Sequence, residues 1–437
     1  MKRVEAIPVL ERGTLGRWLM HSIHRQPGGK WAFRFLVFLV SIAVLADFLA
    51  YPKPLWAVYK GETHFPMAKD WFVGMGWSSW QADLVHADWK TLDLESAVWA
   101  PVRWGPNELD TGNGKIGPFD EQSHPNWKFR HFLGTHTNGK DVLSGLIHGT
   151  RISLTIGIVA VGIAGLIGIL LGSIAGFFGD HRLQLTRAYK FMMLFCIPLA
   201  FFYAFQARHY ILRDSLQLHA GSFGLEMMVS LAVFVGVLAL GRIMAFPLER
   251  IPYLARKSPV AVDLWISRLT EIVSSVPALL LLLSILVMTK RPSIYFTMTL
   301  IGLISWAGIA QLMRAEMLRV RKLDYITAAE GIGLTTWQTM LRHALPNSIS
   351  SVLVVVAFGI AGAITLESGL SFLGIGVPDD TMTWGKILQA ARFDIRAWWL
   401  TLFPGLFIFL TVTSINLVGE ALRTSLDPKW ESVYPFE

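Results

Sequence analysis

The sequence predicts an all-α integral membrane protein, a polytopic helical bundle with a small domain after its first span. Of its 437 residues, 53% are hydrophobic and only 16% are charged, whereas soluble domains usually contain about 25% charged residues. The Lys and Arg residues behind the net charge of +8 lie between long apolar runs, and not on a soluble face as in nucleic-acid-binding proteins. The single cysteine, Cys196, excludes an intramolecular disulfide and a multi-cysteine metal site. We therefore expect contact with membrane lipid and no nucleic acid partner.

Eight apolar stretches account for the expected spans. A bilayer core needs roughly 20 apolar residues per helix. The stretches lie at residues 31–51, 152–178, 191–205, 227–240, 272–289, 294–312, 352–366 and 398–417. About six of these stretches would form the spans of the core bundle. The two at 191–205 and 227–240 would be additional spans. The 191–205 stretch is short and contains Pro198.

The distribution of Lys and Arg around these spans predicts the orientation. An N-terminal basic stretch precedes an apolar run that ends at Asp47 without a cleavage site, so we expect an uncleaved first span and both termini in the cytoplasm. The expected segments are a cytoplasmic tail (1–30), the first span (31–51), an extracytoplasmic cap (52–148), a span that opens the core (149–178), an insert with two extra spans (179–260), the remaining core (261–425) with a cytoplasmic loop at 313–350, and a cytoplasmic tail (426–437).

The segment at 52–148 is rich in Trp, Gly and Pro and has no long apolar period. We expect it to pack onto the bundle, with substrate contact as the alternative, because aromatic surfaces serve both purposes. In the second span, glycines recur at helical spacing at positions 162, 165, 168, 172 and 176. Such spacing predicts a face on which neighbouring helices approach closely.

A polar and basic stretch follows the span at 294–312. Its pattern predicts a short helix from Tyr325 to Glu330, a glycine break, and a second helix from Thr335 or Thr336 to Ala344 that Pro346 ends. Thr335 is the expected N-cap residue. The segment is too short to span a membrane. By charge it lies on the cytoplasmic face, where it would either dock a partner protein or lie on lipid headgroups.

This stretch resembles the cytoplasmic coupling loop of ATP-binding-cassette (ABC) importer permeases. The resemblance rests on Thr327-Ala328-Ala329, on Gly333 and on His343-Ala344-Leu345-Pro346, although the opening Glu and the Ile of the usual pattern are replaced. Collinear stretches at 133–153, 367–376 and 384–428 resemble the dipeptide, oligopeptide and nickel subfamily, in the subunit type with one early span and a large external loop. Short motifs at 59–66 and 101–103 are similar to an oligopeptide system that also admits microcin C. The additional residues at 181–259 depart from the subfamily.

The resemblance implies a permease subunit in a bacterial inner membrane that imports oligopeptides or related solutes by alternating access. Its partners would be two cytoplasmic ABC ATPases, a second permease subunit and an extracytoplasmic solute-binding protein. ATP would bind to the ATPases, with no cofactor and no enzymatic site in this chain, which lacks a Gly-x-x-x-x-Gly-Lys-Ser/Thr loop. The implied ATPase-coupling residues are Tyr325, Thr327, Ala328, Ala329, Gly333, His343, Leu345 and Pro346. The residues that bind substrate are not identified.

We expect structural roles for the isolated polar residues of the spans. Glu367, near the end of a span, is expected to make a structural hydrogen bond, and Arg242 to extend toward the headgroups. A metal site at His131 and His136 would need a third ligand. The alternatives to an ABC permease are an ion-coupled secondary transporter, which predicts broken helices in paired halves, and a non-transporting membrane scaffold.

Overall fold

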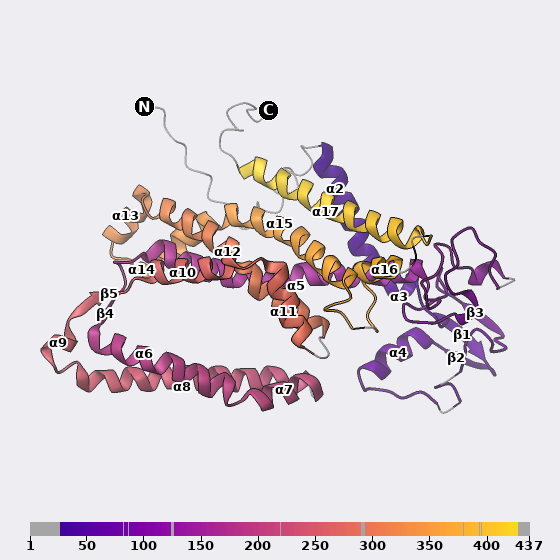
Figure 1. The fold of residues 1–437 in the computed structure, drawn as a ribbon, viewed down its shortest axis with the longest axis horizontal. Helices are drawn as coiled ribbons and strands as arrows, with labels where there is room; N and C mark the ends of the chain where they lie inside the picture. The colour runs from indigo at the N-terminus through magenta and orange to yellow at the C-terminus, as the bar shows by residue number, and fades with distance from the viewer. Residues whose placement is uncertain are drawn as a thin grey trace. The chain divides into compact units, whose positions relative to one another are not determined.

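The computed structural model describes residues 27–426, except for positions 82, 86, 124, 125, 219, 290–292, 379, 393 and 395. Most of the predicted N-terminal tail and nearly all of the predicted C-terminal tail lie outside the described residues. The chain forms two compact units, one of residues up to Ser173 together with those from Thr270 onward, and one of Ile174–Leu269. Figure 1 gives the order of their elements.

The first unit holds most of the long helices. They are α2 (Pro27–Val44), α3 (Ala46–Leu49), α5 (Val142–Phe178, which runs on into the second unit), α11 (Ala278–Met288), α12 (Ile294–Val320), α13 (Asp324–Gly331), α14 (Thr336–Thr339), the π-helical turn η4 (Met340–Ala344), α15 (Leu345–Phe372), α16 (Trp384–Ala391) and α17 (Trp399–Leu426). Helix α2 lies alongside α17 (Figure 1), where Leu39 and Ile415 belong to one apolar cluster. Trp384 lies at the same cluster, fully buried.

Six helices in the described part of the chain are long and apolar enough to cross a membrane: residues 142–178, 187–206, 224–248, 294–320, 336–372 and 399–424. A bent pair, Val262–Ser275 with Ala278–Met288, gives a seventh span if it crosses as one. These helices cover six of the eight predicted stretches, and the bent pair covers most of a seventh, 272–289. The eighth, at 31–51, corresponds to α2 and the short α3. The predicted helical membrane fold is therefore confirmed, with spans generally longer than expected.

The predicted span at 272–289 contains a break that the sequence did not indicate. Helices α10 (Val262–Ser275) and α11 are bent by 76° at the break between them. Pro277 takes the N-cap position of α11 with an extended ψ of 124°. Proline has no backbone N–H, and its ring disfavours a helical conformation in the residue before it. The leucine-rich composition of this stretch concealed the break.

The glycine face of α5 divides among several neighbours. A Cβ atom added to Gly168 would lie 2.8 Å from Ile309 Cβ on α12, whereas one added to Gly165 would lie 3.8 Å from Val356 on α15. At Gly162 nothing lies within 4 Å. The prediction of close helix approach is thus confirmed at Gly168. It is wrong at Gly162, because periodicity alone does not say which turns meet a neighbour.

Helix α12 approaches α5 through a glycine of its own, which gives a stability prediction. A Cβ atom on Gly302 would lie 2.7 Å from the carbonyl oxygen of Ala160. Gly308, on the same helix, has nothing within 4 Å. We expect Gly302→Val to lower the free energy of unfolding by about 1–3 kcal/mol through overpacking and Gly308→Val to leave it nearly unchanged. Thermal unfolding of the detergent-solubilised variants checks this, and equal melting temperatures would contradict it.

Residues 50–141 form a small domain between α3 and α5. It contains a three-stranded antiparallel sheet in the order β2-β1-β3, made of β1 (Trp56–Tyr59), β2 (Glu62–His64) and β3 (Ser96–Val98). Helix α4 (Pro66–Gly74) follows β2, and two 3-10 turns, η1 (Thr111–Asn113) and η2 (Trp127–Phe129), complete it. Trp89 and Trp104 are 2% and 5% exposed. Part of the tryptophan content of this segment therefore builds apolar clusters around Ala57 and Ala50.

The second unit consists mainly of helices. It consists of α6 (Arg187–Phe201), the π-helical turn η3 (Phe202–Gln206), α7 (His209–Leu218), α8 (Ala220–Leu248), α9 (Pro252–Ala255), and the paired strands β4 (Gln184–Thr186) and β5 (Lys257–Pro259). Helices α6 and α8 run side by side (Figure 1). An ion pair joins Arg208, between η3 and α7, to Glu226 on α8. Toward the end of α8, Arg242 pairs with Glu249 at 2.8 Å.

Candidate functional site: the hairpin at 324–347

The segment between α12 and α15 forms the predicted helix–turn–helix. Helix α13 ends at Gly331, and the chain reverses through Gly333, whose φ is +93°. This left-handed backbone conformation favours glycine because it has no Cβ atom. The amide of Gly333 donates to the carbonyl of Glu330 at 3.1 Å, and that of Leu334 to Ala329 at 3.3 Å. The predicted glycine break is therefore confirmed.

The second helix begins at a capping box. The Thr335 hydroxyl accepts from the backbone N–H of Gln338 at 3.3 Å, and the Gln338 side chain accepts from the Thr335 N–H at 3.0 Å. Both bonds satisfy amides that a helix N-terminus leaves without partners. The N-cap predicted at Thr335 is confirmed.

The helix does not end at Pro346, so that prediction is wrong. Helix α14, the π-helical turn η4 and α15 form one apolar run from Thr336 to Phe372. Pro346 lies in the first turn of α15. A proline inside a helix removes one hydrogen bond and clashes with the preceding turn. The wider π-helical turn at Met340–Ala344 lies immediately before it and accommodates that change. The hairpin is consequently continuous with a membrane span.

Buried side chains fix the hairpin to its own unit. Ile326 and Ala344 are fully buried, Met340 is 3% exposed and Ala329 is 6% exposed. The Asn347 side-chain amide donates to the Tyr325 hydroxyl at 3.2 Å and to the carbonyl of His343 at 2.8 Å. Tyr325 and His343, far apart along the hairpin, are thus joined through one side chain.

Several apolar side chains of the hairpin are exposed. Ile332 is 81% exposed, Leu341 53%, Trp337 48% and Tyr325 40%. Four of the implied coupling residues lie with them at the surface: Thr327, Ala328, Gly333 and Pro346 are exposed. His343 and Leu345 are half-buried, and Ala329 packs inward. The motif therefore mixes surface residues with residues that hold the helix in place. The motif also omits Leu341, although the structure shows that its side chain is exposed.

The capping box gives a local prediction. Thr335→Ala removes one acceptor from the start of α14 and is expected to cost about 1 kcal/mol of local stability, a typical value for N-caps. Amide hydrogen exchange should accelerate about fivefold at Gln338 and Thr339. Thr335→Ser should retain protection, because serine caps equally well. Unchanged exchange in the alanine variant would show that the cap does not stabilise this turn.

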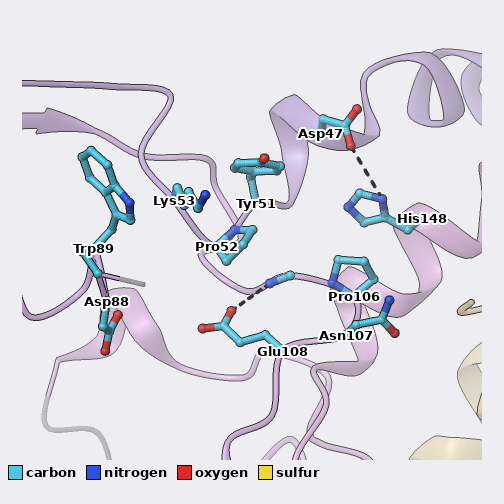
Figure 2. Close-up of a pocket in the computed structure, with 12 residues that line it drawn as sticks. Asp47, Tyr51, Pro52, Lys53, Asp88, Trp89, Pro106, Asn107, Glu108 and His148 are labelled. Carbon is cyan, nitrogen blue, oxygen red and sulfur yellow. Dashed lines mark hydrogen bonds and ion pairs between the residues drawn. The ribbon is translucent and has the colours of Figure 1, made fainter. Parts of the chain in front are cut away.

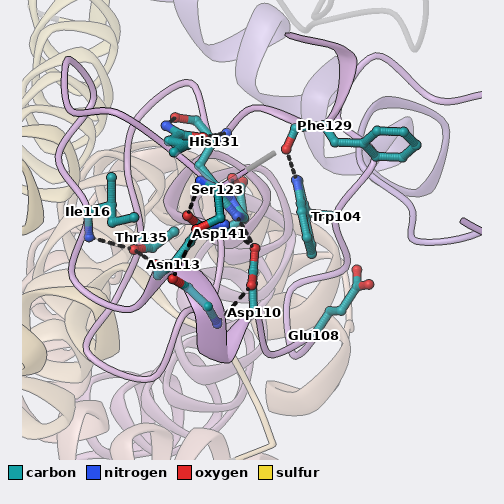
Figure 3. Close-up of polar contacts among 12 residues, drawn as sticks. Trp104, Glu108, Asp110, Asn113, Ile116, Ser123, Phe129, His131, Thr135 and Asp141 are labelled. Carbon is teal, nitrogen blue, oxygen red and sulfur yellow. Dashed lines mark hydrogen bonds and ion pairs between the residues drawn. The ribbon is translucent and has the colours of Figure 1, made fainter. Parts of the chain in front are cut away.

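A buried polar network lies in the 50–141 domain (Figure 3). His131 is fully buried, with Nδ1 2.8 Å from Asp141 and Nε2 3.2 Å from Asp110. Its ring stacks on Trp104 with centroids 4.3 Å apart. Asp141 also accepts from the backbone N–H of Ser144 at 2.6 Å, at the start of α5. His131 therefore links the domain to a membrane span, a structural role that the sequence did not indicate.

His136, the other histidine considered for a metal site, lies apart from this network. Its backbone pairs with Lys140, through the His136 N–H and the Lys140 carbonyl at 2.8 Å. Burial, with Lys140 and Lys386 nearby, lowers the pKa of His136 to about 4. Its side chain is therefore neutral at physiological pH.

A pocket of about 650 Å³ opens beside this domain, lined by Asp47, Lys53, Trp89, Glu108 and His148 among others (Figure 2). Its charged groups are satisfied within the chain. Asp47 pairs with Arg151 at 3.0 Å, Lys53 with Asp70 at 2.8 Å, and Glu108 with Lys90 at 2.6 Å. Burial lowers the pKa of Lys90 despite the attraction of Glu108. The pocket walls are thus held by ion pairs.

Glu367, the isolated acid of α15, is fully buried and accepts from the Ser371 hydroxyl at 2.7 Å. The contact agrees with the structural role predicted for it. Gly385, which follows Trp384, packs against the same turn, since a Cβ atom there would lie 2.6 Å from the Ser368 carbonyl oxygen. Glu367 therefore lies where α15 meets α16.

Comparison with known proteins decides the family. The family described as binding-protein-dependent transport system inner membrane component matches residues 239–432. A putative peptide permease of Brucella ovis is 34% identical over 341 residues, covering 77% of this chain and 82% of the relative. The chain belongs to this family. It is a multi-pass inner membrane protein of the ABC-importer permease type, as the sequence motifs predicted.

Other permeases are similar over much of their length. The inner membrane ABC transporter permease protein YejE of Escherichia coli is 25% identical over 417 residues, covering 94% of this chain and 96% of that protein. The di/tripeptide transport system permease DppC of Pseudomonas aeruginosa is 30% identical over 310 residues, covering 70% and 76%. The region that matches the family, 239–432, contains the whole hairpin at 324–347. The hairpin is therefore within the region that matches the family.

Proposed function

We propose that this permease subunit imports peptides and that ATPase subunits drive it by docking on the hairpin at 324–347. The observation that carries the proposal is the exposed apolar face of Ile332, Trp337, Leu341 and Tyr325, held on a turn between two long apolar helices. Apolar side chains clustered at the end of membrane spans favour contact with another protein. Two long helices leave that turn, so a force applied there reaches the membrane-spanning region.

The hairpin is built to transmit movement as a rigid element. Its two helices share the Tyr325–Asn347 contact at 3.2 Å, and Ile326 and Ala344 are fully buried. From Thr336 the helical run extends 37 residues to Phe372. A displacement of the hairpin would therefore shift this helix as a body, which is how packed elements carry conformational change. The residues of the hairpin would transmit force, while ATP binding and hydrolysis belong to the partner subunits.

The names of relatives support peptides as the substrate class. They include a di/tripeptide system of Pseudomonas aeruginosa and an oligopeptide system of Haemophilus influenzae. The remaining partners would be a second permease subunit and an extracytoplasmic solute-binding protein, since the family is that of binding-protein-dependent systems. Both termini and the hairpin would face the cytoplasm, in keeping with the positive-inside rule.

Co-purification of the native complex tests the docking proposal. Wild-type protein tagged at the C-terminus should retain ATPase subunits in mild detergent. Deletion of residues 325–345 should release them, while the second permease remains bound. If ATPase subunits stay bound to the deletion variant, they dock elsewhere and the proposal fails.

A further inference from the structure

Three basic side chains in the second unit have no acidic partner. Arg250, Arg256 and Lys257 are exposed, and none of their side chains makes a hydrogen bond or ion pair within the described part of the chain. They lie within eight residues of one another, on the connection between α8 and α10. A cluster of uncompensated cations attracts an anionic partner.

The acid next to Arg250 in the sequence, Glu249, is already engaged. Glu249 accepts from the Thr186 hydroxyl at 2.7 Å and from Arg242 at 2.8 Å. Asp180 accepts from the backbone N–H of Leu264 at 3.0 Å. Glu249 therefore balances the charge of Arg242, and none of the ion pairs in the described part of the chain includes Arg250, Arg256 or Lys257.

Apolar side chains accompany the bases. Ile251 is 49% exposed and Tyr253 is 65% exposed. The Arg187 guanidinium lies 4.5 Å from the centre of the Tyr253 ring. Mixed aromatic and basic surfaces at the ends of membrane spans are typical of the headgroup region. The connection thus presents charge and apolar surface together.

The local fold keeps this surface at the end of two candidate spans. Strand β5 pairs with β4 in the register Thr186 to Lys257, and the Arg187 N–H donates to the Arg256 carbonyl at 3.2 Å. Residue 187 begins one candidate span, and the other ends at Leu248. The bases are therefore held next to the boundary at which lipid phosphates lie.

We propose that Arg250, Arg256 and Lys257, with Ile251 and Tyr253, form a binding site for the headgroup of an anionic phospholipid. The bases would contact the phosphate, while Ile251 and Tyr253 would enter the boundary between headgroups and acyl chains. A lipid suits this surface better than a soluble anion, because the apolar residues would otherwise face water. The site requires only that the second unit lies in the membrane and does not depend on which solute is transported.

Lipid binding to the purified full-length protein tests the proposal. Native mass spectrometry would follow protein taken from nanodiscs with equal amounts of phosphatidylglycerol and phosphatidylethanolamine. Wild type should retain phosphatidylglycerol preferentially. The variant Arg250→Gln/Arg256→Gln/Lys257→Gln should lose at least about tenfold in that preference, since each base near an anionic surface contributes on the order of fivefold. The control variant Lys60→Gln/Lys128→Gln/Arg213→Gln removes the same charge from exposed positions outside the cluster and should behave as wild type.

Further results separate the possible outcomes. A variant with Arg250→Lys and Arg256→Lys keeps the charge and should retain the lipid, which would exclude a folding defect as the cause of loss. Equal retention of the two lipids by wild type would overturn the proposal. So would an equal loss in both triple variants, or displacement of the lipid by millimolar inorganic phosphate.

Discussion

Ile332→Asp combined with Trp337→Asp is expected to reduce peptide uptake by at least about thirtyfold, the effect of losing a hot spot worth about 2 kcal/mol. Both side chains are at least 48% exposed, so the substitutions should leave the fold intact. Each would bring a carboxylate to a surface that the proposed ATPase contact buries, where an unpaired charge is costly. Uptake of a labelled peptide by cells with equal amounts of the protein in the membrane measures the effect.

A matched variant shows whether the position matters or only the added charge. Leu109 in the 50–141 domain is 56% exposed, and Leu109→Asp should support normal uptake. Ile332→Val, which keeps the apolar surface, should also transport normally. Normal uptake by the Ile332→Asp/Trp337→Asp protein would mean that the exposed face does not dock an ATPase.

Asp141→Ala is expected to cost about 2–4 kcal/mol, the sum of a buried polar group left without its partner and a lost helix cap. Asp141 is 1% exposed and lies 2.8 Å from His131. It also accepts from the backbone amide of Ser144 at 2.6 Å, so the substitution loses a helix cap and leaves the buried imidazole without one of its acceptors. Limited proteolysis of the 50–141 domain and thermal unfolding would report the loss.

Two substitutions separate the causes. Asp141→Asn retains an oxygen that can cap α5 and should recover part of the lost stability, because asparagine is a good N-cap residue. Asp93 is exposed, and Asp93→Ala should be nearly neutral. Equal stability of the Asp141→Ala and Asp93→Ala proteins would contradict the structural role assigned to His131.

Local chemistry explains which parts of the hairpin could be predicted from the sequence. The residue types of Thr335 and Gly333 were enough to predict their roles. Thr335 caps a helix, and Gly333 adopts a left-handed backbone conformation. Apolar length likewise located the spans, because a bilayer fixes how many residues a helix needs. The coupling motif came from a resemblance, and the inward-facing Ala329 shows that such a motif does not distinguish contact residues from packing residues.

Other features depend on contacts between distant residues. From the sequence, Pro346 was predicted to end a helix. In the structure, the π-helical turn before it lets the helix continue. The short strands β1 and β3 pair across about 40 residues of chain, and such pairing leaves little local pattern in sequence. The link between His131, Asp110 and Asp141 also requires the folded domain. Helical periodicity cannot reveal contacts of this kind.

Site-specific cross-linking tests the docking of ATPase subunits most directly. Cys196 is the only cysteine of the chain, so Cys196→Ser provides a background for single cysteines. Ile332→Cys, labelled with a photoactivatable reagent in the assembled complex, should form an adduct with an ATPase subunit. Val98→Cys in the 50–141 domain, at a position 53% exposed in the wild type, should form none. An intact complex in which position 332 yields no ATPase adduct would contradict the proposed coupling.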